Sequence, residues 1–176
     1  MSRILYEGFH RIEEVDAVMK GKVVKREKLF IYPAVAGIVI DENKRIALVK
    51  QYRPVIGRDT LELPAGILDK PHLTPLETLI EELAEECDLT MDDLLKVGPE
   101  PLHEYFMTVG SSDAKMRIYE VRVRNQGETS KLVDDVDVDS VEWLTYEEME
   151  AHIANGDIAD NKTILAYYML PMLLEK

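Results

Sequence analysis

The alternation of apolar and polar residues changes several times along the chain, and each change marks a predicted element. Residues 8–20 and 22–32 alternate roughly on either side of Gly21, which predicts an N-terminal β-hairpin. The run AVAGIVI (34–40) is apolar throughout, as is typical of a strand buried on both faces. After a short polar turn, IALVKQYR (46–53) predicts the next strand. The pattern up to this point therefore predicts a hairpin that leads into a sheet.

A helix with clear boundary signals follows. Thr74 can cap its N-terminus, Pro75 suits the first helical position, and Glu77 completes a capping box. Apolar residues then recur at the spacing of one helical face, which predicts a helix that runs to about Cys87 and packs on a core. The residues of this face are Leu76, Leu79, Ile80, Leu83, Ala84 and Cys87.

Strands and helices are mixed in the rest of the chain. The elements predicted there are a short strand at 61–63, strands at 116–124 and 140–145, a helix at 146–155 that ends before Gly156, and a C-terminal helix at 161–176 disturbed at Pro171. This mixture predicts an α+β fold, with a mixed sheet and helices on its faces. Because no repeat or Gly-, Ser- or Pro-rich linker interrupts the pattern, we expect one domain at 33–176, preceded by an N-terminal β extension at 1–32.

Composition and charge narrow the function. The 176 residues carry a formal net charge of −13, which argues against binding along a nucleic acid backbone, since that requires clustered Lys and Arg. No apolar run approaches the roughly 18 residues that a membrane span needs, and the N-terminal residues are too charged for a secretory signal. Cys87 is the only cysteine, which excludes an intrachain disulfide. We therefore expect a cytoplasmic protein that binds neither nucleic acid nor membrane.

Four glutamates crowd the second half of the predicted helix: Glu81, Glu82, Glu85 and Glu86. One interpretation is a solvated helix face. The other is a metal site, because like charges four residues apart cost roughly 0.2–0.5 kcal/mol per pair and the C-terminal half of a helix disfavours anions. A divalent cation would turn this repulsion into coordination, and Mg²⁺ takes oxygen ligands while also binding substrate phosphates.

This stretch resembles the Nudix box, whose pattern is G-x5-E-x7-R-E-U-x-E-E-x-G-U with U an aliphatic residue. Gly66 stands for the first glycine, Glu82-Leu83-Ala84-Glu85-Glu86 matches E-U-x-E-E, and Leu89 matches the last aliphatic residue. The segments YPAVAGIVIDENKRIALVKQYRP and LELPAG are similar to those that precede the box in the ADP-ribose pyrophosphatase branch. EYFMTVGSSDAKMRIYEVRV resembles that branch's Ser-Pro-Gly loop and its following strand.

The chain departs from the pattern at several positions. The first glutamate of the box is missing, and Gly66 lies one residue further from Glu82 than in the pattern. Glu81 stands where the family has an arginine that helps to orient the metal-binding glutamates. Further differences are Asp88 for the penultimate glycine, Val109 for the proline of the later loop and Ala114 for an acidic residue in it.

The resemblance implies a Nudix-type α/β/α sandwich and Mg²⁺-dependent hydrolysis, with Mn²⁺ as the other candidate ion. The substrate would be a small nucleoside diphosphate derivative such as ADP-ribose or a nucleotide sugar, cleaved at its pyrophosphate bond. Relatives in this branch are commonly homodimers that exchange N-terminal strands, a role that the extension at 1–32 would take here.

The resemblance also assigns roles to individual residues. The implied metal site comprises the turn at Ala65 and Gly66 with Glu82, Glu85 and Glu86; the implied catalytic residues are Glu85, Asp135 and Asp137; and the implied substrate-binding residues are Arg53 and Asp113. Asp135 and Asp137 belong to an acidic run that a solvated loop would also explain. The run does not fit an EF-hand, because its sixth position is not glycine and its twelfth is Tyr146.

Two other functions stay open at this point. The altered box favours a catalytically impaired Nudix-fold module that binds nucleotides or regulates a partner. An acidic structural or interaction protein without a ligand is the third reading.

Overall fold

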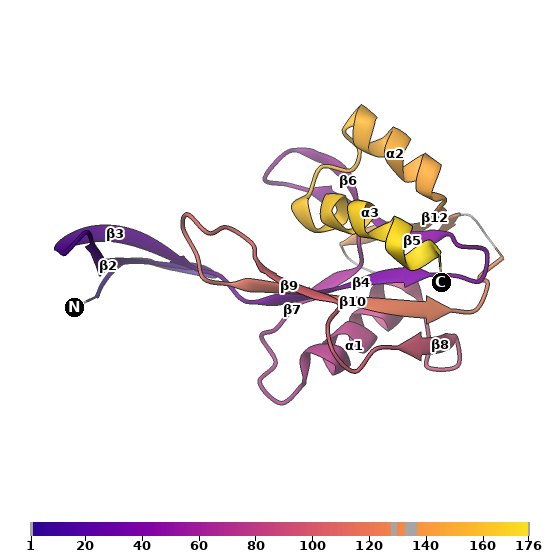
Figure 1. Cartoon of the computed structure of the whole chain (residues 1–176), viewed down its shortest axis with the longest axis horizontal. Helices are drawn as coiled ribbons and strands as arrows, with labels where there is room; N and C mark the ends of the chain where they lie inside the picture. The colour runs from indigo at the N-terminus through magenta and orange to yellow at the C-terminus, as the bar shows by residue number, and fades with distance from the viewer. Residues whose placement is uncertain (1, 128–129, 133–136, 176) are drawn as a thin grey trace.

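The molecule consists of a body and a projecting N-terminal sheet (Figure 1). The structure is a computed structural model that describes residues 2–127, 130–132 and 137–175. Among these residues, no helix combines the length and the apolar character that crossing a membrane requires.

The N-terminal sheet contains three antiparallel strands in the order β1 (Arg3–Glu7), β2 (Arg11–Met19) and β3 (Lys22–Phe30). The predicted hairpin is confirmed: Met19 pairs with Lys22 across a two-residue turn. Both turn residues, Lys20 and Gly21, have positive φ angles of 51° and 76°, as a type I′ hairpin turn requires. The first strand, β1, was not predicted.

The body is built on a mixed sheet with the strand order β11-β12-β5-β4-β10-β8, in which β6 also pairs with β5, β7 with β4 and β9 with β10. Its strands are β4 (Ala34–Ile40), β5 (Ile46–Arg53), β6 (Arg58–Glu62), β7 (Ala65–Ile67), β8 (Leu94–Val97), β9 (His103–Phe106), β10 (Lys115–Val123), β11 (Ser130–Leu132) and β12 (Val138–Leu144). The β4–β10 pair is parallel and the others are antiparallel. The strand expected at 61–63 lies instead at 58–62, and the shortest strands were not predicted.

Helices cover both faces of this sheet. They are α1 (Pro75–Cys87), α2 (Tyr146–Asn155) and α3 (Asn161–Leu174). The central strand β4 is buried throughout: Ile38 and Ile40 pack with the cluster under α2 and α3, whereas Val35 and Val39 pack with the cluster under α1. Figure 1 shows α1 on one side of the sheet and the other two helices on the opposite side. The predicted α+β fold with an α/β/α arrangement is confirmed.

The three helices lie where they were predicted, but the buried face of α1 and the effect of Pro171 on α3 differ from the prediction. The Thr74–Glu77 capping box of α1 is formed. Ala84, which was expected on the buried face, is exposed, because that face is centred on Leu79 and Leu83 and Ala84 lies a further 100° around the helix. The C-terminal helix continues through Pro171 to Leu174, since only about one more turn follows the proline.

Candidate active site

Two glutamates of α1 meet the start of β7. Ala65 and Gly66, which were predicted to form a turn, are the first residues of this strand and pair with Ala36 and Val35 of β4. We call residues 63–66, which connect β6 to β7 and begin β7, the active-site turn. The backbone N–H of Ala65 donates a hydrogen bond of 3.0 Å to Glu86 Oε2. A Cβ atom at Gly66 would lie 2.1 Å from Glu82 Oε1 and 2.4 Å from its Cγ, so only glycine lets the Glu82 carboxylate come this close. We call Glu82 and Glu86 the inner carboxylates, because the turn and the sheet cover them partly.

The other two glutamates lie on the outer side of the same helix. Glu85 is exposed, and the carboxylate of Glu81 lies 2.7 Å from Lys70 Nζ, with both side chains almost half exposed. The hydrogen bond to Glu81 raises the pKa of Lys70, and the charges of Glu85 and Glu82 add to this effect. We call Glu81 and Glu85 the outer carboxylates. The row of four predicted from the sequence is therefore divided into two pairs with different surroundings.

The inner carboxylates offer the oxygen donors that a hard divalent cation prefers. Gly66 lets the Glu82 carboxylate lie against the backbone, and the N–H of Ala65 holds Glu86 beside it. These residues fit a metal ion in their chemistry. Within the residues that the structure describes, no three acidic, histidine or cysteine side chains are grouped closely enough to hold a metal in this arrangement, and Glu85 is exposed.

Arg53, at the end of β5, forms a two-point ion pair beside the inner carboxylates. Its Nε and Nη2 atoms each donate a 2.7 Å hydrogen bond to the carboxylate of Glu62. This bond raises the pKa of Arg53, with smaller contributions from Asp160 and Glu86, which places Arg53 within electrostatic reach of the inner carboxylates. The side chain of Arg53 is 46% exposed and that of Glu62 only 4%.

Two further donors complete the surroundings of Glu62. Thr60 Oγ1 lies 2.5 Å from Oε1, and Lys162 Nζ lies 2.5 Å from Oε2. Burial opposes ionisation of Glu62, but the hydrogen bonds from Arg53 and the positive charge of Lys162 outweigh it and lower the pKa to about 2. Sequence reasoning missed Thr60, Glu62 and Lys162. The signal for Glu62 was a charged residue inside the apolar LEL segment, whereas the position of Lys162 gives no such signal.

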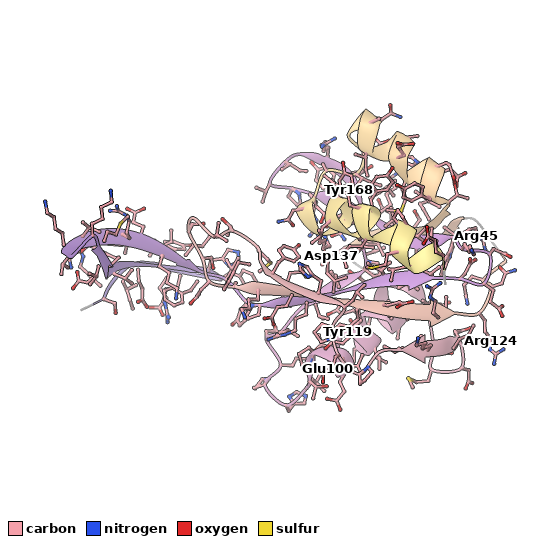
Figure 2. All side chains as sticks on the ribbon, in the orientation of Figure 1. Arg45, Glu100, Tyr119, Arg124, Asp137 and Tyr168 are labelled. Atoms are coloured by element: carbon pink, nitrogen blue, oxygen red, sulfur yellow. The ribbon has the colours of Figure 1, made fainter. Side chains whose placement is uncertain are left out.

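The predicted acidic residues outside α1 lie in different places. Asp137 directly precedes β12, and its neighbour Val138 pairs with Gln51, two residues before Arg53, so the sheet brings Asp137 to the same end of β5 as Arg53. Asp137 is labelled in Figure 2. Asp135 lies outside the described residues.

Asp113 contacts the N-terminal sheet. Its carboxylate lies 2.5 Å from Lys28 Nζ of β3, and this hydrogen bond lowers the pKa of Asp113. The adjacent backbone is held as well, since the N–H of Leu29 donates to the carbonyl oxygen of Ser111 at 2.8 Å. The loop that carries this substrate-binding candidate is therefore tied to the extension, and the role of Asp113 stays a prediction.

Comparison with known proteins shows the family of the chain. The model of the NUDIX domain family matches residues 31–167. A methanol dehydrogenase activator of Bacillus methanolicus is 30% identical over 166 residues, covering 92% of this chain and 84% of the relative. An ADP-ribose pyrophosphatase of Mycobacterium tuberculosis is 31% identical over 149 residues, covering 82% and 67%. One of Bacillus subtilis is 27% identical over 161 residues, covering 92% and 83%.

A solved structure supports the fold independently. The crystal structure of an ADP compounds hydrolase superposes with a TM-score of 0.75 over 99% of this chain and 92% of that chain, at 17% identity. The family model covers most of the chain, and two of the relatives are at least 30% identical over most of its length. The chain therefore belongs to the NUDIX domain family and is a Nudix hydrolase similar to ADP-ribose pyrophosphatases.

Proposed function

We propose that the chain hydrolyses the pyrophosphate bond of a nucleoside diphosphate derivative, with ADP-ribose as the first candidate substrate and Mg²⁺ as the metal. One observation carries the proposal: Glu82 and Glu86 both contact the active-site turn, at Gly66 and Ala65. Arg53, which is held by two hydrogen bonds to Glu62, lies within electrostatic reach of Glu86. The name of two relatives as ADP-ribose pyrophosphatases supports the choice of substrate.

In this proposal the inner carboxylates and the backbone of the active-site turn would hold the cation, which would supply positive charge for the diphosphate and for activation of a water. Glu85, one turn from Glu82, adds a ligand or a base from the outer side. Nε and Nη2 of Arg53 are engaged by Glu62, so the opposite edge of the guanidinium, with Nη1, is turned to the substrate and donates to a phosphate oxygen. Asp135 or Asp137 accepts the proton of the attacking water.

The test is a hydrolysis screen of nucleoside diphosphate derivatives with Mg²⁺ and with Mn²⁺. We expect Mg²⁺-dependent release of AMP from ADP-ribose, and a loss of at least about a hundredfold in kcat for Glu86→Gln, because the variant loses one anionic metal ligand. Equal turnover by this variant would contradict the assignment of the site. Absence of turnover with every substrate would contradict the hydrolase proposal.

A second candidate is a regulatory role in which the same site binds a nucleotide without turnover. Two observations favour it: the similarity to the methanol dehydrogenase activator, and Glu81 in place of the arginine of the box. Calorimetry with ADP-ribose, with and without Mg²⁺, separates the two candidates. Binding without release of AMP supports the regulatory role, and turnover of the same ligand supports the hydrolase.

We also propose a cytoplasmic homodimer in which the N-terminal sheet lies in the interface. The sheet exposes apolar side chains that the rest of this chain does not cover, including the cross-strand pair Val18 and Val23, each at least two-thirds exposed. The variant Val18→Glu/Val23→Lys keeps a favourable cross-strand pair while it removes this apolar surface. Sedimentation equilibrium should show a dimer for the wild type and a monomer for the variant; a monomeric wild type would contradict the proposal.

A further inference from the structure

The N-terminal turn of α3 holds the end of β6 at two consecutive residues. Lys162 Nζ lies 2.5 Å from Glu62 Oε2, and Thr163 Oγ1 accepts a 2.9 Å hydrogen bond from the backbone N–H of Leu63. Leu63 is the first residue of the active-site turn, which seats the inner carboxylates. Contacts that span 100 positions of the chain thereby join α3 to the active-site turn.

The carboxylate of Glu62 is saturated with donors. Oε1 accepts from Arg53 Nε and Thr60 Oγ1, and Oε2 accepts from Arg53 Nη2 and Lys162 Nζ. A carboxylate offers about four lone-pair positions, so Glu62 has none left for a substrate or a metal. Any effect of Glu62 on the reaction must therefore pass through one of its partners, and Arg53 is the partner that reaches solvent.

Stability alone does not explain a lysine at position 162. Its side chain is 8% exposed, and it is held between the carboxylates of Glu62 and Asp160 at 2.5 and 3.0 Å. Apolar residues of similar volume are often as stable as, or more stable than, a buried ion pair, because burying the charges is costly. An apolar residue at this position would not fix the orientation of the Glu62 carboxylate, whereas the ion pair does.

We propose that Lys162 is a positioning residue that aims the guanidinium of Arg53 at the diphosphate of the substrate by fixing the carboxylate of Glu62; this inference rests on the proposed hydrolase function. Lys162 Nζ and Arg53 Nη2 share the Oε2 atom, so the lysine prevents rotation of the carboxylate plane. The two parallel bonds then fix the plane of the guanidinium and the direction of its Nη1 edge. Lys162 itself touches no substrate.

The decisive experiment is a double-mutant cycle on ADP-ribose hydrolysis with Arg53→Met, Lys162→Met and the double variant. We expect Arg53→Met to raise KM roughly tenfold or more, and Lys162→Met to raise it severalfold with a much smaller change in kcat, because ground-state and transition-state contacts to the phosphate are lost together. In the Arg53→Met background, Lys162→Met should change KM no further. Additive effects on KM would overturn the proposal. Lys162→Arg, which keeps the cation, should recover part of the wild-type KM.

A matched control is available at the opposite end of β5. Arg45 forms a buried ion pair with Asp41, with side chains 11% and 0% exposed, and Figure 2 labels Arg45 far from Asp137. Arg45→Met should lower the thermal midpoint as Lys162→Met does, but leave KM unchanged. A rise in KM of the same size for Arg45→Met would show that lost stability, and not lost positioning, raises KM.

A second measurement tests the positioning without turnover. The ¹⁵N resonance of the Arg53 Nε–H group, identified by its absence in Arg53→Lys, should show at least about tenfold faster hydrogen exchange with water in Lys162→Met than in the wild type or in Arg45→Met. Unchanged exchange would overturn the proposal.

If Lys162→Met does not fold, Thr60→Val can replace it. This variant removes a neutral donor from the same carboxylate and should also make the exchange of the Arg53 Nε–H group faster. A wild type that hydrolyses none of the substrates contradicts the proposed function, and the exchange measurement still decides the positioning.

Discussion

The two sides of the glutamate row on α1 have opposite physical characters. On the inner side, Glu82 lies against Gly66 and Glu86 accepts a hydrogen bond from Ala65, and the buried carboxylate of Glu62 holds the half-exposed Arg53. On the outer side, Glu81 and Glu85 face solvent. Sites that must place charge accurately are held by packed neighbours, whereas exposed charges mainly change the local field.

The outer side also shows how the chain accommodates its unusual box. The family pattern has a glutamate in the loop before the helix and an arginine at the position of Glu81. Here the loop supplies a cation, Lys70, and the helix supplies the anion, at 2.7 Å. Compared with the family pattern, the loop carries the positive charge and the helix the negative one, so the net charge of the pair is the same. The departure that weakened the expectation of catalysis is therefore balanced within the same part of the molecule.

The largest effect is expected where the inner side is broken sterically. Gly66→Ala places a Cβ atom where the Glu82 carboxylate now lies, and the flexible glutamate must take another rotamer. Activity should fall about a hundredfold because the carboxylate is displaced by more than an ångström, while the free energy of unfolding should change little. Gly98→Ala is the matched control, since its Cβ would meet only a carbonyl oxygen at 3.4 Å. Unchanged turnover in Gly66→Ala would show that the position of Glu82 is unimportant.

The next effect is on stability. Glu62→Gln removes the negative charge between Arg53 and Lys162 and leaves two cations facing a neutral group. Breaking a buried pair on one side should lower the free energy of unfolding by about 3 kcal/mol. Urea unfolding at pH 7 measures this loss. A loss comparable to that of an exposed ion pair, below about 1 kcal/mol, would contradict the buried character of the network.

The same network predicts a dependence on pH. The pKa of Glu62 is lowered from 4.5 to about 2 in the folded protein, so its contribution is fully present above pH 4.5 and is lost as the pH falls towards 2. The shift corresponds to about 3 kcal/mol at neutral pH. The stability difference between wild type and Glu62→Gln should therefore shrink over this range. A difference that stays constant down to pH 2 would show that the pKa is not lowered.

The smallest effects are expected on the outer side. Glu81→Arg and Lys70→Glu each place like charges together, and each should lower kcat/KM severalfold at low salt with no measurable change in the thermal midpoint. The double variant Lys70→Glu/Glu81→Arg restores an opposite pair and should return close to wild type. At high salt the differences should become smaller because exposed charges are screened. Additive losses in the double variant would mean that the two residues act separately.

Local signals were enough to predict most of the fold. The Lys20–Gly21 turn, the apolar run of β4 and the capping box at Thr74 each depend on a few neighbouring residues. Strands of three or four residues, such as β7 and β8, are too short to show a period of two. Ala84 was placed wrongly because the buried face of a helix is decided by what packs on it.

The site was predicted only as far as its residues are close in sequence. The box is a local pattern, so the resemblance to it pointed to Gly66, Glu82 and Glu86, although Gly66 lies one residue off the spacing of the pattern. Lys162 was not, because its contact with Glu62 spans 100 positions and exists only after α3 packs on the sheet. Of the two predicted bases, Asp137 lies at the end of β5 because β12 pairs with β5, and Asp135 is outside the described residues.

The most direct test of the account is whether the inner carboxylates bind the metal. Mn²⁺, followed by its paramagnetic resonance signal, should bind the wild-type protein, bind at least about tenfold more weakly to Glu82→Gln/Glu86→Gln, and bind with nearly wild-type affinity to Glu81→Gln, which removes the same kind of charge from the outer side. Equal weakening by the inner and outer variants would show that the row acts only as a diffuse negative surface, and would contradict the account.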